Sequence, residues 1–237
     1  MKFTPPLIEG ILLRRYKRFL ADVQLPDGSV ITAHTPNTGS MLGCCTPGSR
    51  VWLRDSGSAT RKYRHSWELV EAGCGVMVGI NTAIVNGLVA EAIDSGVIGE
   101  LAGYGRLRQE VRYGQENSRI DLLLEDGVDG RDCYVEIKNV TARDGEGFAM
   151  FPDAVSARGT KHLRELAAMV AAGHRAVIFF CVQRGDSHTV RPADEIDPAY
   201  GQTLRGALAS GVEALAYAAT VEPGGIALVR PLPVTCP

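Results

Sequence analysis

The stretch CYVEIKNVT, residues 133–141, places an acid and a base two positions apart in an otherwise apolar run. In an extended strand, successive side chains point to opposite faces, so Glu136 and Lys138 share one face and Ile137 points to the other. Charged side chains are seldom buried without partners. This face therefore either meets water, where the pair is a solvated ion pair, or it performs chemistry.

A second acid, Asp121, lies in the preceding strand-like stretch SRIDLLLE. The segment between the two stretches, EDGVDGRD, is rich in turn residues and predicts a hairpin. A hairpin brings Asp121 and Glu136 to the same end of a sheet, with Lys138 about 7 Å along the strand from Glu136. These three side chains are the candidate catalytic residues.

Two carboxylates are suited to holding Mg²⁺ (or Mn²⁺), because such ions prefer oxygen ligands and keep open positions for water and phosphate. A bound metal ion lowers the pKa of its water and polarises a phosphate. We expect Asp121 and Glu136 to be the metal ligands. Lys138 would orient the water or stabilise the charge that develops on the phosphate.

The elements that must position these residues fall into two parts. Residues 1–81 contain about five short strands with Gly-rich turns, including a turn at Pro26-Asp27-Gly28, and this pattern predicts an OB-fold-like β-barrel. From residue 82 the pattern changes to helices and strands in the order α-β-β-β-α-β-α-β. The run RAVIFFCVQ is apolar on both faces, as expected of a central strand. We therefore expect an α+β chain whose second domain covers residues 82–237.

The charge is divided unevenly between these parts. The formal net charge is −2, yet residues 1–85 hold ten Lys and Arg against six Asp and Glu, whereas residues 86–237 hold fifteen against twenty-one. Two basic clusters with interleaved aromatic residues, LRRYKRF and RKYRHSW, lie in the first part, and their cations are Arg14, Arg15, Lys17, Arg18, Arg61, Lys62 and Arg64. Cations attract phosphates and aromatic rings stack on bases. This pattern favours nucleic acid as the partner, and the alternative is a solvated barrel with core aromatics.

Two further segments offer polar groups to a phosphate. Asn37 lies in the polar stretch TPNTGSM, which we expect to face either a phosphate or the second domain. Arg158, Lys161 and His162 precede the apolar stripe of the helix ARGTKHLRELAAM, where a helix N-terminus attracts anions. His162 alone is weak evidence for a general base.

The cysteines and the hydropathy limit the location and the cofactors. The six cysteines include no C-x-x-C pair, so we expect neither a zinc site nor a structural disulfide. No apolar run has the length of a membrane span, and the N-terminal residues lack a signal-peptide core. These features favour a cytoplasmic protein that does not associate with membranes.

Longer stretches carry a resemblance to a known family. Asp121 with Glu136-Ile137-Lys138 on an αβββαβ framework resembles the PD-(D/E)-x-K nucleases, although Ile120 replaces the proline that often precedes the aspartate. The chain as a whole is similar to the sugar fermentation stimulation protein (SfsA) family through TPNTGSM, EVRYG, SRIDLLL, CYVEIKNVT and FPDAVSARGTKHLRELAAM. The resemblance implies an N-terminal OB-fold joined to a restriction-endonuclease-like domain, DNA binding, and a link to the regulation of sugar metabolism.

The nuclease resemblance also implies an auxiliary acid from the first helix. We expect Glu91, which lies at the border of the apolar face of the helix NTAIVNGLVAEAIDSG. The alternative is Glu110 on the following strand.

Two functions follow from these observations. The first is a Mg²⁺-dependent nuclease that binds DNA, with RNA as the other polymer to consider. The second is a DNA-binding transcriptional regulator that uses a nuclease scaffold without cleaving. A sugar-handling enzyme is disfavoured, because no nucleotide loop or sugar-specific motif is present. The sequence leaves the oligomeric state open.

Overall fold

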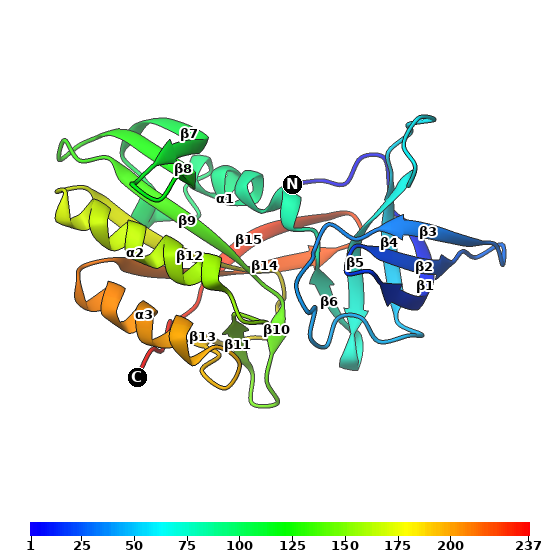
Figure 1. Cartoon of the computed structure of the whole chain (residues 1–237). Helices are drawn as coiled ribbons and strands as arrows, with labels where there is room; N and C mark the ends of the chain where they lie inside the picture. Colours follow the sequence, from blue (N-terminus) through cyan, green and yellow to red (C-terminus); the bar gives the residue numbers. More distant parts are fainter.

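A computed structural model describes residues 1–237 apart from the side chain of Cys74. The chain forms two lobes that lie side by side, an all-β lobe and an α/β lobe (Figure 1). The expected order, a barrel followed by an α/β domain, is confirmed. Within the described residues, no helix is both long and apolar enough to cross a membrane.

The first lobe is a barrel with strand order β3-β2-β1-β4-β5-β6, closed by a pairing between β3 and β5. Its strands are β1 (Ile8–Tyr16), β2 (Leu20–Gln24), β3 (Val30–His34), β4 (Arg50–Asp55), β5 (His65–Ala72) and β6 (Val76–Gly79). Leu12, Leu53 and Trp67 are fully buried in its core. β1 and β2 were expected as one run, because the turn between them contains no Gly or Pro. Lys17 and Arg18 make this turn with positive φ angles of 51° and 65°, a conformation that such residues rarely adopt.

The second lobe is built on a mixed sheet with strand order β15-β14-β12-β9-β8-β7. Its elements are α1 (Val85–Asp94), β7 (Tyr104–Tyr113), β8 (Ser118–Gly127), β9 (Cys133–Val140), α2 (Ala157–Ala171), β12 (Arg175–Val182), α3 (Pro198–Ala209), β14 (Glu213–Glu222) and β15 (Gly225–Pro231). A small second sheet, which the sequence pattern did not predict, joins β10 (Ala142–Arg143), β11 (Phe148–Phe151) and β13 (Thr189–Pro192).

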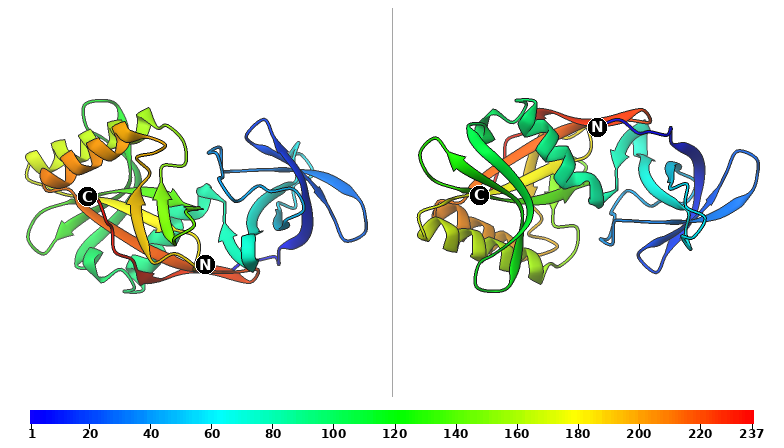
Figure 2. Two further views of the ribbon diagram at one scale, coloured as in Figure 1. Left: turned by 90° about the horizontal axis from the view of Figure 1, so that it is seen from below. Right: turned by 90° about the horizontal axis from the view of Figure 1, so that it is seen from above.

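Helices cover both faces of the main sheet. α2 and α3 lie together on one face and α1 lies on the other (Figure 2). The alternation along β12 produces this layering, because Val177 and Phe179 pack in the core under α1, whereas Ile178 and Phe180 pack in the core under α2 and α3. β9 and β12 are neighbours in the middle of the sheet. Glu136 and Lys138 of β9 pair with Ile178 and Phe180 of β12, so the acid–base pair is held on that side by the central strand of the sheet.

The loop that follows β3 joins the two lobes. The Asp153 carboxylate accepts hydrogen bonds from the Ser40 hydroxyl at 3.0 Å and from the main-chain N–H of Met41 at 2.9 Å. The Thr82 hydroxyl donates to the Pro36 carbonyl at 3.1 Å. The polar stretch TPNTGSM therefore faces the second domain, which was one of the two expectations for it.

Five cysteines are free thiols, namely Cys44, Cys45, Cys133, Cys181 and Cys236. The sixth, Cys74, lies outside the described side chains. Burial raises the pKa of the Cys133 thiol to about 12 and that of Cys44 to about 11, so both remain protonated at neutral pH.

Candidate functional site

Asp121 lies at the point where β8 and β9 stop pairing. The ladder between the strands ends with Leu122 opposite Val135. Beyond this pair, the Asp121 carboxylate replaces a main-chain acceptor, and its Oδ2 accepts a hydrogen bond from the N–H of Ile137 at 2.7 Å. The two strands therefore separate here, and the Asp121 carboxylate lies beside Glu136-Ile137-Lys138.

Glu136 is buried among cationic and polar groups. Its side chain is 3% exposed, and its Oε1 accepts a hydrogen bond from Lys138 Nζ at 2.7 Å. The same oxygen also contacts His162 Nδ1, which reaches it from α2. The other oxygen, Oε2, is buried and has no hydrogen-bond partner among the described residues. Such an oxygen is costly to bury unless a ligand completes it.

The two carboxylates have opposite pKa shifts. Burial and the nearby charge of Glu136 raise the pKa of Asp121 to about 6. Burial also opposes ionisation of Glu136, but Lys138 and His162 outweigh it, so the pKa of Glu136 lies below its usual value. At neutral pH both groups are ionised and repel one another, an arrangement that a bound cation would relieve.

The structure does not bring Glu91 to this site. Its carboxylate is 54% exposed and pairs with the N-terminal ammonium of Met1 at 2.7 Å. Instead, Asn86 occupies the side of α1 that faces the sheet, and its Nδ2 contacts Asp121 Oδ1 at 3.3 Å and Glu110 Oε1 at 3.1 Å. Of the two acids weighed as auxiliary acid, Glu110 therefore lies near Asp121 and Glu91 does not, because Glu91 follows Asn86 by five residues and points elsewhere on the helix.

Glu110 has an unusual backbone conformation. It lies on β7 between Gln109, which pairs with Leu122, and Val111, which pairs with Ile120, so the register sets it level with Asp121. Its φ angle is +54°, in the left-handed region. A positive φ is costly for a residue with a side chain and is often retained at functional sites. Here it accompanies the approach of the Glu110 side chain to Asn86.

Two cavities flank the carboxylates. One, of about 320 Å³, lies between the β7–β8 hairpin and the start of α2, and its lining includes Glu110 and His162. The other, of about 190 Å³, lies between the barrel loop and the second domain, and its lining includes Asn37, Lys138 and Asp153. His162 lines the first cavity and Lys138 the second, and both side chains contact the Glu136 carboxylate.

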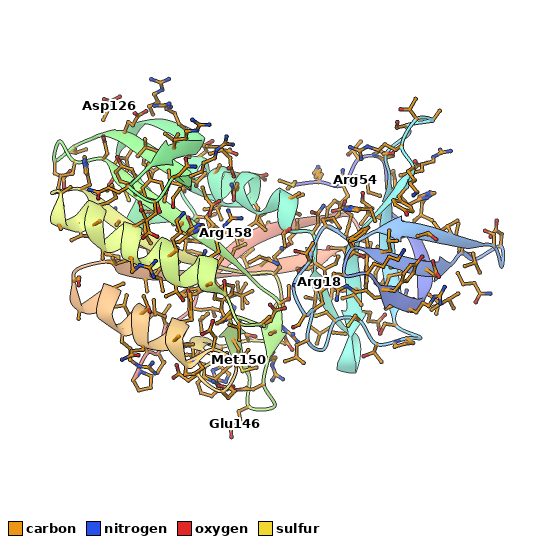
Figure 3. All side chains as sticks on the ribbon, viewed as in Figure 1. Arg18, Arg54, Asp126, Glu146, Met150 and Arg158 are labelled. Carbon is orange, nitrogen blue, oxygen red and sulfur yellow. The ribbon has the colours of Figure 1, made fainter. Side chains whose placement is uncertain are left out.

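The first cavity is rich in cations that lack a carboxylate partner. Arg112 and Arg119 line it from β7 and β8, and Arg158 and Lys161 line it from α2. Figure 3 shows Arg158 at the beginning of α2. Arg158 donates only to His162 Nε2 at 3.3 Å, and Lys161 contacts the Glu116 carbonyl. Among the described residues, none of these four forms an ion pair. We call Arg112, Arg119, Arg158 and Lys161 the cationic pocket.

Most expected cations of the barrel have partners already. Arg14 pairs with Asp22 at 2.8 Å and Arg64 pairs with Asp55 at 2.5 Å. Arg15 donates to four main-chain carbonyls, and Arg18 donates to the Thr38 carbonyl at 3.0 Å. In the described part of the chain, Lys17, Arg61 and Lys62 form no ion pair. Lys62 lies over the ring of Tyr63.

Asn37 shapes the loop whose main-chain carbonyls accept hydrogen bonds from Arg15 and Arg18. It is 6% exposed, its Oδ1 accepts a hydrogen bond from the Gly39 N–H at 2.8 Å, and its carbonyl accepts one from Arg15 at 3.1 Å. It lines the second cavity, beside Lys138. Its direct hydrogen bonds are to Gly39 of its own loop and to Arg15 of β1.

Four contributors to the site were not selected from the sequence. They are Asn86, Arg112, Arg119 and His162. Of these, only His162 is mentioned in the sequence analysis, as weak evidence for a general base. His162 precedes Leu163 and follows the buried Gly159 by three residues, so helical periodicity could have placed it on the buried face. Arg112 and Arg119 lie on exposed strand positions and carry no local signal of their role.

Comparison with known proteins gives matches along the whole chain. The SfsA N-terminal OB domain matches residues 13–80, and the sugar fermentation stimulation protein RE domain matches residues 83–225. A sugar fermentation stimulation protein homolog of Thioalkalivibrio sulfidiphilus is 65% identical, and the match covers 99% of this chain and 98% of that protein. A homolog of Geobacter metallireducens is 60% identical, with 99% of each chain covered.

A solved structure has the same fold. It is the SfsA of Pyrococcus furiosus in complex with Ca²⁺, which is 30% identical and superposes with a TM-score of 0.88. The match covers 99% of this chain and 98% of the other. A likeness of this extent includes both lobes.

Proposed function

The chain belongs to the sugar fermentation stimulation protein family, and on that premise we propose that it binds DNA and cleaves phosphodiesters at a Mg²⁺-dependent site. The carrying observation is the convergence of Asp121, Glu136 and Lys138 at the point where β8 and β9 separate. The link to sugar metabolism rests on the family name alone. A cytoplasmic location accompanies this proposal.

The residues present fit a divalent cation. Glu136 Oε2 is buried and lacks a partner, and the Asp121 carboxylate lies beside it with a raised pKa. Mg²⁺ is commonly bound through one or two carboxylates, with water and substrate phosphate completing the shell. The described residues contain no group of three or more His, Cys, Asp and Glu side chains that could hold a metal ion, so the proposed site rests on two carboxylates. The Ca²⁺ in the structure of the Pyrococcus furiosus relative also supports this proposal.

Each side chain has a role in the proposed cleavage. Asp121 and Glu136 would hold Mg²⁺ or Mn²⁺, which when bound activates water and polarises the phosphate. Lys138 is fixed by Glu136 at 2.7 Å, so its ammonium is already in place to stabilise the charge that develops on the phosphate. His162 contacts the same oxygen of Glu136 as Lys138 does, and the two contacts together leave the second oxygen without a partner.

A non-catalytic DNA-binding regulator is the second candidate. The observation that favours it is that Glu136 already has two partners, Lys138 and His162, so its charge is compensated without a metal. In this case the cationic pocket would bind the DNA backbone and the carboxylates would be structural.

Incubation with single- and double-stranded DNA and RNA separates the two candidates. We expect cleavage with Mg²⁺ or Mn²⁺ and none with a chelator. Glu136→Gln should abolish cleavage, and Arg108→Gln, on an exposed position of β7, should leave it unchanged. DNA binding without cleavage under every metal condition would establish the regulator instead. Calorimetry adds a second readout, because Mg²⁺ should bind the wild type and not Glu136→Gln.

A further inference from the structure

We infer that the cationic pocket receives a terminal phosphate of a nucleic-acid strand, so that cleavage takes place near a strand end. This inference rests on the proposed function and deepens it by naming the kind of substrate. It is carried by the shape of the pocket, by its excess of unpaired cations and by its position beside the carboxylates.

The turn between β7 and β8 lies at one end of the pocket, and Asn117 of this turn is part of the lining. Three side chains of α2 hold this turn through Glu116. Arg164 pairs with the Glu116 carboxylate at 3.2 Å, Glu165 accepts a hydrogen bond from the Glu116 N–H at 2.7 Å, and Lys161 contacts the Glu116 carbonyl. A nucleic-acid strand that enters the pocket from the side of Asp121 and Glu136 therefore meets a turn that α2 holds in place. This geometry favours a chain end over a backbone that continues through the pocket.

The conformation of the turn also fixes its position against α2. Gly114 has a φ of +69°, and a Cβ atom at this position would lie 1.1 Å from Glu165 Oε2. Only glycine therefore permits the turn to approach α2 so closely. The turn is thus a fixed wall and not a loose loop.

The charge in the pocket suits a dianion. A backbone phosphodiester carries one negative charge, whereas a terminal phosphate carries close to two at neutral pH. Arg112, Arg119 and Arg158 have no carboxylate partner among the described residues, and Lys161 meets only a carbonyl. Arginine can also bind phosphate oxygens through two parallel hydrogen bonds. The excess of positive charge is greater than one diester would neutralise.

A buried hydroxyl in the lining also lacks a partner. Ser118 is 4% exposed, lines the cavity, and its Oγ has no hydrogen-bond partner within the described structure. A buried polar group without a partner is uncommon, and an oxyanion is the acceptor that this hydroxyl needs.

The opposite end of the pocket leads to the carboxylates. His162 lines the pocket and contacts Glu136, and Glu110 lines the pocket and contacts Asn86, which in turn contacts Asp121. A strand whose end is held at Arg119 would pass these residues and present its next phosphodiesters to Asp121 and Glu136.

Fluorescence anisotropy with short labelled oligonucleotides tests this inference. The oligonucleotides carry a 5′-phosphate, a 3′-phosphate or only hydroxyl ends, and each is measured in a chelator and in Ca²⁺. We expect the wild type to bind one phosphorylated form roughly tenfold more tightly than the hydroxyl form, as a bidentate arginine contact allows. The preferred form identifies which end enters the pocket. Arg112→Gln and Arg119→Gln, both at exposed positions, should lose this preference.

Arg108→Gln is the matched control, because Arg108 is on the same strand as Arg112 but pairs with Glu125 outside the pocket at 3.2 Å. It should keep the preference. Binding of all three oligonucleotides with equal affinity would overturn the inference and leave the proposed function intact. A preference that survives Arg112→Gln and Arg119→Gln would overturn the assignment to this pocket. Failure to bind or cleave any nucleic acid would overturn the proposed function and the inference with it.

Discussion

Arg14 and Arg64 of the barrel each lie against an aspartate, whereas Arg112, Arg119 and Arg158 of the second domain line a cavity without one. The anions follow the same division. Asp22 and Asp55 have lowered pKa values because their arginines hold them, while Asp121 has a raised pKa and lies beside an unpartnered oxygen of Glu136. The barrel pairs several of its charges internally, whereas the second domain has four cations without a carboxylate partner lining one cavity, and a buried oxygen of Glu136 without a partner among the described residues.

This difference predicts that net charge is a poor guide to where an anionic ligand binds. The barrel is the net-basic part of the chain, yet several of its cations are already bound to carboxylates or carbonyls. A cation that has a partner must give it up before it can bind a phosphate, and this exchange reduces the gain in free energy. The second domain is net-acidic, yet it gathers four cations without a carboxylate partner in the lining of one cavity.

The largest expected effect concerns Arg15, whose guanidinium donates to the carbonyls of Arg18, Asn37 and Gly39. Arg15→Ala should lower the free energy of unfolding by about 3 kcal/mol, because hydrogen bonds to charged groups contribute about 1.5–3 kcal/mol each and are not additive. Urea denaturation measures this. Lys17→Ala, at an exposed position in the turn that follows β1, is the control and should change stability little.

Unchanged stability in Arg15→Ala, together with weaker DNA binding, would show that Arg15 is a ligand-binding residue. The statement that internal partners hold the arginines of the barrel would then be wrong for Arg15.

The next effect concerns Asp121, whose pKa is raised from 3.8 to about 6. A raised folded-state pKa means that ionisation opposes folding, so the wild type loses stability as the pH rises from about 4 to 6. Asp121→Asn removes this loss and should stabilise the metal-free protein by about 2 kcal/mol at pH 7.5, with the gain shrinking toward pH 4. Denaturation at the two pH values in a chelator measures this.

Mg²⁺ should reverse the order, since it stabilises only the protein that binds it. A destabilised Asp121→Asn protein at pH 7.5 would show that the carboxylate is already compensated, and the claim of uncompensated charge would be wrong.

A smaller effect is expected from the cationic pocket. Arg158→Gln should weaken DNA binding roughly tenfold and lower the slope of log affinity against log salt by about one, as loss of one phosphate contact predicts. Arg64→Gln in the barrel is the matched control, because its guanidinium is held by Asp55. Affinity titrations at several salt concentrations measure both. An equal loss in the two variants would remove the distinction between paired and unpaired arginines.

The parts of the structure that the sequence predicted depend on local patterns. Strand alternation and a turn-rich loop suffice to place Asp121, Glu136 and Lys138 together, and the change of periodicity near residue 82 separates the barrel from the α/β domain. These signals lie within about twenty residues of the groups that they position.

The parts that were missed depend on distant contacts. His162 meets Glu136 across 26 residues, and Arg15 meets Gly39 across 24. Glu91 was preferred over Glu110 because helical periodicity fixes which residues share a face but not which way that face turns. The direction is set by packing, which places Glu91 against the N-terminal ammonium of Met1 and Asn86 against Asp121.

The smallest expected effect concerns the barrel cations that have no ion-pair partner in the described structure. Lys17, Arg61 and Lys62 are exposed, and no cavity among those described has any of them in its lining. If the barrel assists only through general attraction, the triple variant with Gln at these positions should weaken DNA binding by about threefold at moderate salt and less at high salt, because exposed charges are screened. Anisotropy titrations compare it with Arg158→Gln. A loss greater than that of Arg158→Gln would establish the barrel as the principal gripping surface, as its net charge alone suggests.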